Sequence, residues 1–180
     1  PPHPRPRRQR QMCIRDRYIP CFGLTGPQNG SDATGSIDEG ILNLNVDNLN
    51  NKHIEIEINK RYITLAPVAS LIGLAFRVND KHNLNGGKGG VTLALLERDT
   101  PGLEINTHHN PLNVGFPNGT LKGKIKIPTE CIIGGEENIG EGWKMLMECL
   151  SAGRGVSLPA TANASSKVCL LYTSDAADEV

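Results

Sequence analysis

Alternation of apolar and charged residues is the clearest pattern in the middle of the chain. Residues 53–59 (HIEIEIN) place an isoleucine at every second position, with glutamates between them. A period of two is typical of a strand with one buried and one exposed face, so we predict a half-buried strand there. Residues 120–127 (TLKGKIKI) alternate apolar residues with lysines and predict an edge-like strand in the same way.

Further short runs of apolar and β-branched residues surround these two segments. They predict strands at residues 61–66, 71–78, 91–97 and 103–105. Polar or glycine-rich turns separate them, and residues 83–90 (NLNGGKGG) read as a flexible connection. Five or six short strands at this spacing favour a small antiparallel barrel or sandwich. Residues 36–51 are compatible with a hairpin or with a longer loop.

The pattern becomes helical after residue 142. A stripe with spacings of three and four is formed by Trp143, Leu146, Met147 and Leu150. We interpret it as the packing surface of a helix against other helices. Because Gly153, Gly155 and Pro159 follow, we expect a first helix that ends near Leu150. The predicted fold class is mainly β with a C-terminal helix.

The two ends of the chain differ in character from the rest. Residues 7–17 read RRQRQMCIRDR, and residues 169–179 read CLLYTSDAADE. A DNA sequence that encodes MCIRD has a reverse complement that, in a shifted frame, encodes CLLYT. Unrelated natural termini are not expected to be related in this way. We therefore interpret residues 1–17, which we expect to be disordered, and residues 169–180 as translated sequencing-adapter tails, and exclude both from fold reasoning.

Composition narrows the possible functions. The chain has 19 Lys and Arg against 19 Asp and Glu, and six of the arginines lie in the N-terminal tail. Without the tails the chain is slightly acidic and has no aromatic stacking platform, so nucleic-acid binding is not expected. The chain contains no apolar run of about 18 residues, so no membrane span is predicted. Outside the tails, Cys21, Cys131 and Cys149 are odd in number and widely spaced, which favours reduced thiols in a cytoplasm over disulfides or a metal site.

The segment most able to carry chemistry is residues 21–35 (CFGLTGPQNGSDATG). Four glycines and Pro27 make a loop that a ligand can approach closely. Thr25 and Ser31 supply hydroxyls, and the amides at Gly30 and Ser31 are unshielded, so the loop could meet a flat polar ring and a diphosphate. It matches neither the dinucleotide fingerprint nor a P-loop. Taken alone, it is compatible with a ligand site or with a structural turn.

The order of residues in this loop resembles the signature loop of the acyl-CoA dehydrogenases. The matching positions are Gly23, Leu24, Thr25, Pro27, Gly30, Ser31 and Asp32. Residues 60–64 (KRYIT) resemble the second flavin-contacting strand of that family, and residues 99–103 and 114–127 resemble its later strands. Residues 128–135 (PTECIIGG) and 140–143 resemble the passage into the C-terminal helical domain. The phrases NKRYITLAP, PLNVGFPNG and ECLSAGRG resemble the FadE-type branch of bacterial fatty-acid β-oxidation.

The resemblance implies a middle β-barrel domain over residues 18–135 and the start of a C-terminal all-α domain over residues 136–168. It implies an FAD-dependent enzyme that oxidises medium- or long-chain acyl-CoA to trans-2-enoyl-CoA. It assigns no catalytic residue here, because the family's carboxylate base belongs to a part of the helical domain that this fragment lacks. Alone, the fragment is expected to be inactive.

The resemblance also implies roles for single residues. Leu24 by its backbone and Thr25 by hydrogen bonding would meet the pyrimidine side of the flavin, and Ser31 would lie near the FAD diphosphate and the substrate. Tyr62 would pack on the ring, and Thr64 would reach its N5 edge. Two positions depart from the family: Gly26 stands where glutamate is usual, and Tyr62 stands where tryptophan is common but keeps an aromatic face.

Partners and location follow from the same resemblance. The implied partners are the acyl-CoA substrate, an electron-transfer flavoprotein or similar acceptor, and further copies of the full-length chain. The implied location is the cytoplasm, with the inner-membrane periphery as a possibility. Two other interpretations stay open at this point: an acyl-CoA oxidase-like flavoprotein, and a flavin-free β-barrel binding module.

Overall fold

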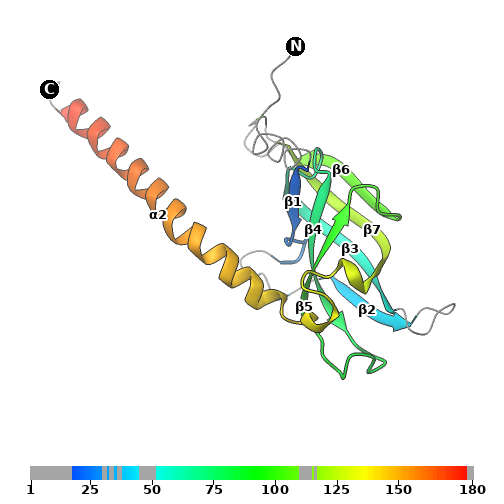
Figure 1. The fold of residues 1–180 in the computed structure, drawn as a ribbon. Helices are drawn as coiled ribbons and strands as arrows, with labels where there is room; N and C mark the ends of the chain where they lie inside the picture. The colour runs from blue at the N-terminus through cyan, green and yellow to red at the C-terminus, as the bar shows by residue number, and fades with distance from the viewer. Residues whose placement is uncertain are drawn as a thin grey trace, which may run out of the picture. The chain divides into compact units, whose positions relative to one another are not determined.

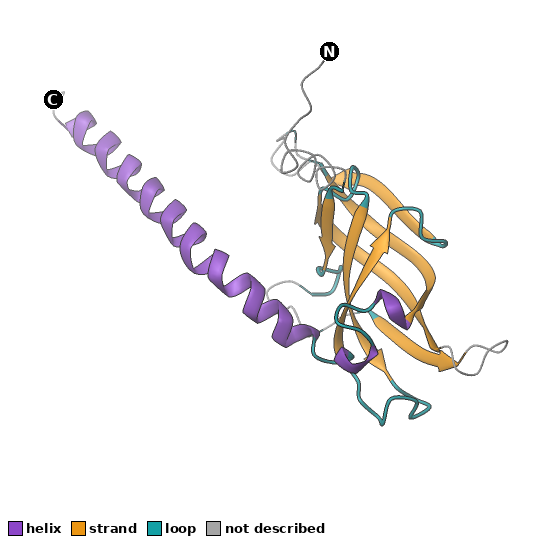
Figure 2. Cartoon of the chain, in the orientation of Figure 1, coloured by secondary structure: helices purple, strands orange, loops and turns teal. Residues whose placement is uncertain are grey.

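The chain folds as a β-sheet unit followed by a helix. The computed structural model describes residues 18–29, 32, 35, 38–44, 52–109, 115 and 117–177. It divides into two compact units, Pro1–Gly142 and Trp143–Val180. The first unit holds the strands and two short 3-10 helices, and the second is helical (Figures 1 and 2). The predicted fold class, mainly β with a C-terminal helix, is confirmed.

Seven strands form a single sheet. They are β1 (Pro20–Gly23), β2 (Glu39–Leu44), β3 (Lys52–Thr64), β4 (Leu71–Asn79), β5 (Gly90–Glu97), β6 (Leu103–His109) and β7 (Asn118–Pro128). β4 pairs with β5 along its length and with β1 and β2 at its two ends. From β2 the sheet continues through β3 and β7 to β6. Two short 3-10 helices follow β7, η2 (Thr129–Cys131) and η3 (Glu136–Asn138).

The sheet is mixed, which corrects the expectation of a purely antiparallel barrel. Both β1 and β2 run parallel to β4, whereas the other pairs are antiparallel. Parallel neighbours need long connections, so they leave no local hairpin signal in the sequence. Residues 36–51 were compatible with a hairpin or with a longer loop. In the described part of this segment, residues 39–44 form β2, which pairs antiparallel with β3. Residues 45–51 lie outside the described residues.

The isoleucine alternation builds the core as predicted. Ile54, Ile56 and Ile58 of β3 are buried, and the glutamates between them are exposed. Their partners in the core come from β2, β4, β5 and β7: Leu42, Ile72, Leu74, Phe76, Ala94, Leu121, Ile125 and Ile127. Full burial of each large side chain contributes about 1.5–3 kcal/mol. This shared core lets one sheet of short strands fold as a unit.

The predicted strands at residues 53–59 and 61–66 are one strand. β3 continues through a register shift against β7 between Lys60 and Ile63. A β-bulge of this kind inserts extra backbone while the pairing continues on either side. The separation into two strands was therefore wrong, and the bulge lies at the start of the YIT segment.

The second unit is the helix α2 (Gly142–Ala177), which is longer than predicted. The expected end near Leu150 was wrong, since the helix continues through Pro159. One proline removes a single backbone donor, and the alanines that follow it, Ala160, Ala162 and Ala164, favour helix. All side chains over residues 153–173 are exposed, apolar ones included. Within the described part of the chain, no helix is long and apolar enough to cross a membrane.

Candidate cofactor site

The glycine-rich loop and the YIT segment meet at one place in the fold. The loop starts where β1 ends, at Gly23, and runs along β3. The backbone amide of Arg61 donates a hydrogen bond of 2.9 Å to the carbonyl oxygen of Thr25. The ammonium of Lys60 donates one of 3.2 Å to the carbonyl oxygen of Leu24. Two stretches that the sequence analysis assigned to one site are thus brought together.

A buried ion pair lies beneath this loop. The Lys60 side chain is 1% exposed, and its Nζ atom is 3.2 Å from Oδ2 of Asp38. The same carboxylate accepts a hydrogen bond of 3.1 Å from the backbone amide of Asn59. Burial lowers the pKa of Lys60, and the neighbouring Asp38 carboxylate opposes that shift. A buried charge requires such a partner, because leaving it unpaired is strongly destabilising.

Neither Lys60 nor Asp38 was predicted from the sequence as a site residue. For Lys60, however, the alternation along β3 contains a signal. Lys60 continues the series of Ile54, Ile56 and Ile58, so a period-two reading places it on the buried face of β3. A lysine at a core position demands a buried acceptor. Asp38 supplies it from just before β2, at the end of the loop segment.

The β-bulge presents an exposed aromatic ring. Tyr62 has a backbone φ of 60°, which is rare for a bulky residue. Its side chain is 53% exposed, and the guanidinium carbon of Arg61 lies 4.8 Å from the centroid of its ring. Backbone strain of this kind clusters at ligand-binding positions.

Thr64 follows at the end of β3. It is exposed like Tyr62, and Ile63 between them is buried. Its hydroxyl donates a hydrogen bond of 3.3 Å to Oδ1 of Asn118, the residue opposite it on β7. The hydroxyl is therefore oriented by its neighbour and remains at the surface.

The space around Gly26, which stands where the resembled family usually has glutamate, is tight. A Cβ atom at this position would lie 2.8 Å from Oδ1 of Asn29 and 3.2 Å from the carbonyl oxygen of Asn59. The Gly26 amide also donates a hydrogen bond to Oδ1 of Asn29. A side chain here would displace the tip of the Asn29 side chain and press on the carbonyl oxygen of Asn59. Leu24 and Thr25 are half-buried in the present conformation.

The loop also holds an unused donor. The Asn29 side chain is buried, and its Nδ2 atom has no hydrogen-bond partner in the described part of the chain. Such atoms are rare because each costs the desolvation of a polar group. Ser31, the remaining predicted contact, lies outside the described residues. Tyr62 and Thr64 are exposed and Thr25 is half-buried, so an aromatic ring and hydroxyls are accessible to a polar ligand, whereas Asn29 Nδ2 is enclosed.

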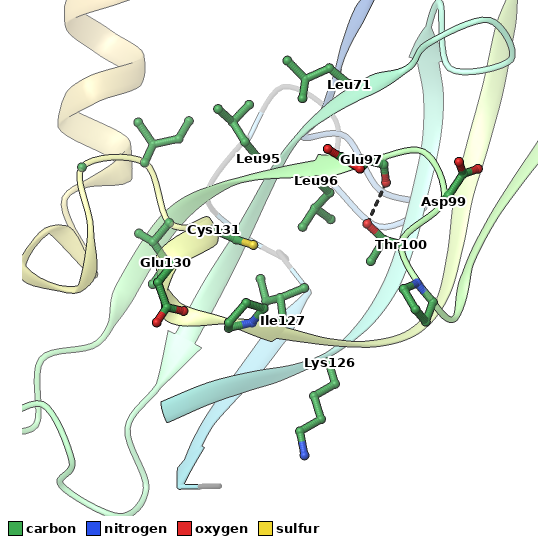
Figure 3. A pocket seen from close by; sticks show the side chains of 15 residues that line it. Leu71, Leu95, Leu96, Glu97, Asp99, Thr100, Lys126, Ile127, Glu130 and Cys131 are labelled. Atoms are coloured by element: carbon green, nitrogen blue, oxygen red, sulfur yellow. Dashed lines mark hydrogen bonds between the residues drawn. The ribbon is translucent and has the colours of Figure 1, made fainter. Parts of the chain in front are cut away.

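An apolar cleft of about 800 Å³ lies elsewhere in the β unit (Figure 3). Its wall comes from the end of β5 and from the segment around η2, and includes Leu95, Ile127, Cys131 and Ile132. Three carboxylates lie along it, those of Glu97, Asp99 and Glu130, against one cation, Lys126. An anionic cofactor is disfavoured by such a lining. None of the predicted cofactor residues belongs to the cleft, so its size does not make it the candidate site.

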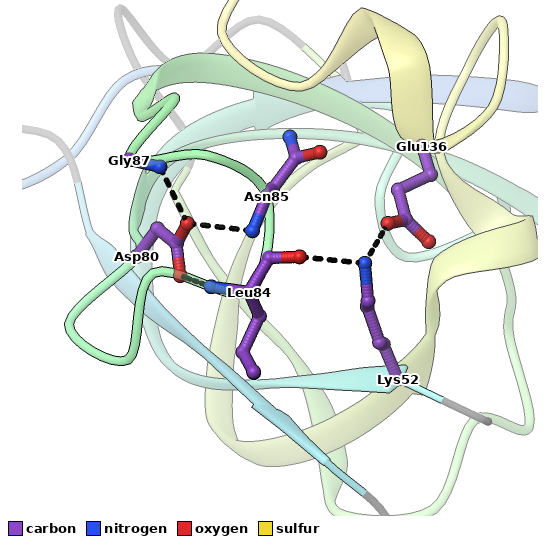
Figure 4. Close-up of polar contacts among 6 residues, drawn as sticks. All are labelled: Lys52, Asp80, Leu84, Asn85, Gly87 and Glu136. Carbon is purple, nitrogen blue, oxygen red and sulfur yellow. Dashed lines mark hydrogen bonds and ion pairs between the residues drawn. The ribbon is translucent and has the colours of Figure 1, made fainter. Parts of the chain in front are cut away.

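A polar cluster closes the connection between β4 and β5 (Figure 4). The Asp80 carboxylate accepts hydrogen bonds from the amides of Leu84, Asn85 and Gly87, at 2.8, 2.8 and 3.1 Å. Lys52 donates to the carbonyl oxygen of Leu84 at 2.8 Å and pairs with Glu136. Partial burial opposes ionisation of Asp80, but the amides and Lys52 outweigh it and lower its pKa. The described residues contain no group of three or more His, Cys, Asp or Glu side chains that could hold a metal ion.

The seven-stranded mixed sheet, with a glycine-rich loop bonded to β3, defines the class of this protein as a β-domain. The family model of the acyl-CoA dehydrogenase middle domain matches residues 21–122. The chain therefore belongs to the acyl-CoA dehydrogenase family. The short-chain-specific acyl-CoA dehydrogenase of Megasphaera elsdenii is 30% identical over 150 residues, which cover 78% of this chain and 34% of that protein.

Other relatives agree in fold or match part of the chain. The solved butyryl-CoA dehydrogenase of Megasphaera elsdenii has a TM-score of 0.61 and 26% identity, over 78% of this chain and 34% of that one. An acyl-CoA dehydrogenase of Bacillus anthracis in complex with FAD has a TM-score of 0.58 and 23% identity. The match covers 74% of this chain and 21% of that one. Protein HemX of Proteus mirabilis is 46% identical over 85 residues, 47% of this chain and 50% of that protein. The chain spans half or less of the length of these relatives.

Proposed function

We propose that this chain is part of an FAD-dependent acyl-CoA dehydrogenase of the FadE type, which oxidises medium- or long-chain acyl-CoA to trans-2-enoyl-CoA in fatty-acid β-oxidation. In this proposal, residues 18–135 are its middle β-domain and residues 136–168 begin its C-terminal helical domain. Residues 1–17 and 169–180 are tails that are not native to the enzyme. The catalytic base belongs to the remainder of the enzyme, so the isolated chain is inactive.

The observation that carries the proposal is the contact between the loop and the bulged strand. The hydrogen bond from Arg61 to Thr25 places the two stretches that resemble flavin-contacting segments side by side. Tyr62, the residue after Arg61, is exposed. A single planar ligand could therefore touch both stretches, as a cofactor pocket requires.

Each proposed contact has a distinct task. The backbone of Leu24 and the hydroxyl of Thr25 hold the pyrimidine side of the flavin. The Thr64 hydroxyl leaves Oδ1 of Asn118 and donates toward the N5 edge of the flavin instead. Tyr62 covers the ring and excludes water, and Ser31 lies near the diphosphate and the acyl-CoA. When bound, the flavin accepts the hydride that leaves the β-carbon of the substrate. The chain's own residues orient the ring and the acyl group toward each other.

The proposed partners are those of a complete enzyme. They are the acyl-CoA substrate, an electron-transfer flavoprotein or similar acceptor, and further copies of the full-length chain. The proposed location is the cytoplasm or the periphery of the inner membrane. Neither nucleic acid nor a metal ion has a part in the proposed reaction.

The full-length protein that contains this segment tests the proposal. It should purify yellow, show flavin absorbance, and bleach when palmitoyl-CoA is added without oxygen. A colourless protein that takes up no FAD would instead indicate a flavin-free binding module. A protein that bleaches and then consumes oxygen rapidly would indicate an oxidase.

Thr64 provides a test of the residue assignment. Thr64→Ala should shift the flavin absorbance bands and slow bleaching, because it removes a donor at the ring. Thr64→Ser keeps a hydroxyl at the same place and should leave the spectrum close to that of the wild type. Identical spectra for both variants would contradict the placement of Thr64 at the ring edge.

A further inference from the structure

We infer that Lys60, held by Asp38, is a positioning residue that aims the Leu24–Thr25 peptide at the flavin and tunes the ring through it. The inference rests on the proposed function, because it needs a flavin beside the loop. It adds Lys60 and Asp38 to the candidate site. Both lie outside the loop motif, residues 23–32, that resembles the acyl-CoA dehydrogenases.

The geometry gives this peptide a defined direction. Lys60 holds the carbonyl oxygen of Leu24, and the Arg61 amide holds that of Thr25. The described residues include no cis peptide bond, and in a trans peptide the N–H points opposite to the C=O. The Thr25 amide therefore points away from the Lys60 ammonium, and the Gly26 amide points away from the β3 backbone. The Gly26 amide donates to Asn29, so our inference assigns the Thr25 amide to the flavin.

The ammonium strengthens that donor. A carbonyl bound by a cation polarises its peptide unit, and hydrogen bonds in a chain strengthen one another. Lys60 is buried, where electrostatic effects are screened less than in water. The Asp38 carboxylate offsets part of the charge, so the effect runs mainly through the polarised peptide. A flavin gains negative charge on reduction, and a stronger donor at its pyrimidine edge favours the reduced form.

The fold itself gives no reason for a charge at this position. Lys60 lies in the isoleucine series of β3, and its Cγ atom packs within 3.6 Å of the Cβ position of Gly23. Replacing a buried ion pair by apolar or neutral groups of similar volume is often neutral or stabilising. A pair with a purely structural role could therefore be replaced without consequence for the flavin.

The test uses the full-length protein with its flavin bound. Lys60→Met alone leaves the Asp38 carboxylate buried and unpaired and can prevent folding, so the double variant Lys60→Met/Asp38→Asn carries the test. It should fold with an unchanged circular dichroism spectrum. Its flavin reduction potential should fall, and its affinity for FAD should weaken about tenfold, as expected for the loss of one charge-assisted hydrogen bond.

A matched control is the exposed pair of Glu57 and Lys124, 3.4 Å apart on the same two-strand ladder. Glu57→Gln/Lys124→Met should leave both the potential and the affinity at the wild-type value. A folded double variant of Lys60 and Asp38 with wild-type potential and affinity overturns the inference while the proposed function stands. A wild-type protein that binds no FAD overturns both.

Discussion

The backbone amide of Arg61 donates a 2.9 Å hydrogen bond to the carbonyl oxygen of Thr25, and this bond joins the loop after β1 to β3 within the bulge between Lys60 and Ile63. The loop thus takes its position from the interior of the sheet. Any change that moves the bulge also moves the loop. Predictions about the candidate site can therefore be tested through the stability of β3, without a cofactor.

The positive φ of Tyr62 predicts an inverted preference between alanine and glycine. In a regular strand, glycine is the less stable of the two by roughly 0.5–1 kcal/mol. At a φ of 60°, any residue with a Cβ pays about 1–2 kcal/mol. Tyr62→Gly should therefore be more stable than Tyr62→Ala by about 1 kcal/mol. Urea unfolding of the 180-residue chain, followed by far-UV circular dichroism, measures the difference.

A position with regular strand geometry controls for this. Glu57 is exposed and paired within an unbroken part of the β3–β7 ladder. There Glu57→Gly should be the less stable variant relative to Glu57→Ala. The same order of stability at both positions would show that the backbone at residue 62 is not left-handed in solution.

Substitution of Gly123 by alanine is predicted to cause a larger loss of stability. Gly123 has a φ of 130°, and a Cβ there would lie 1.9 Å from the carbonyl oxygen of Gly102, the residue just before the paired strand β6. Gly123→Ala should cost roughly 3–5 kcal/mol, since strain and backbone overlap add. Gly86 also has a positive φ but open space around it, so Gly86→Ala should cost only about 1 kcal/mol. Equal losses in denaturant unfolding would refute the close approach of β6 and β7.

The sequence predicted those elements whose burial pattern is local. The alternation around Ile56 and Ile125 identified β3 and β7, because each strand exposes one face and buries the other. β1 was missed because four residues with a proline and a glycine carry no period, and its partner β4 lies far along the chain. The bulge at Tyr62 depends on pairing with β7, which no single stretch of sequence records.

The residues of the candidate site also differ in whether the sequence alone could predict them. The loop residues Leu24 and Thr25 were found through a motif, and so was the YIT segment. Lys60 was missed, although its place in the isoleucine series marked it as buried. Asp38 could not be identified from the sequence, because its contact with Lys60 requires the register of β2 against β3. Ser31 remains a prediction.

Cys21 predicts a loss of stability in alkali. Burial raises the pKa of its thiol from 9.0 to about 11, although Arg98 opposes the shift. The folded state thus keeps the proton in a range where the unfolded state has lost it. This contribution is complete below pH 9 and is lost as the pH rises toward 11. Unfolding free energies measured across that range should fall less steeply for Cys21→Ala than for the wild type.

Lys60 changes the free energy of unfolding with pH in the direction opposite to Cys21. The two effects must therefore be separated. The pKa of Lys60 is lowered from 10.5, so between the folded-state pKa and 10.5 the unfolded state binds more protons and stability rises with pH. The difference between Cys21→Ala and wild type cancels this term, because both proteins keep Lys60. A difference that stays constant from pH 9 to 11 would contradict the raised pKa of the thiol.

Asp80 predicts that the loop between β4 and β5 opens when its carboxylate is lost. Asp80→Asn leaves one oxygen acceptor and adds a donor, so the amides of Leu84, Asn85 and Gly87 lose most of their bonding. Hydrogen exchange of these amides should become faster, by an opening free energy of about 1–3 kcal/mol. Because the pKa of Asp80 is lowered from 3.8, the wild type should keep this protection above pH 3.8 and lose it as the pH falls through the lower, folded-state value. Asp99→Asn, at an exposed acid in the turn before β6, should leave the same amides unchanged, and equal protection in both variants would rule out the carboxylate as the centre of the loop.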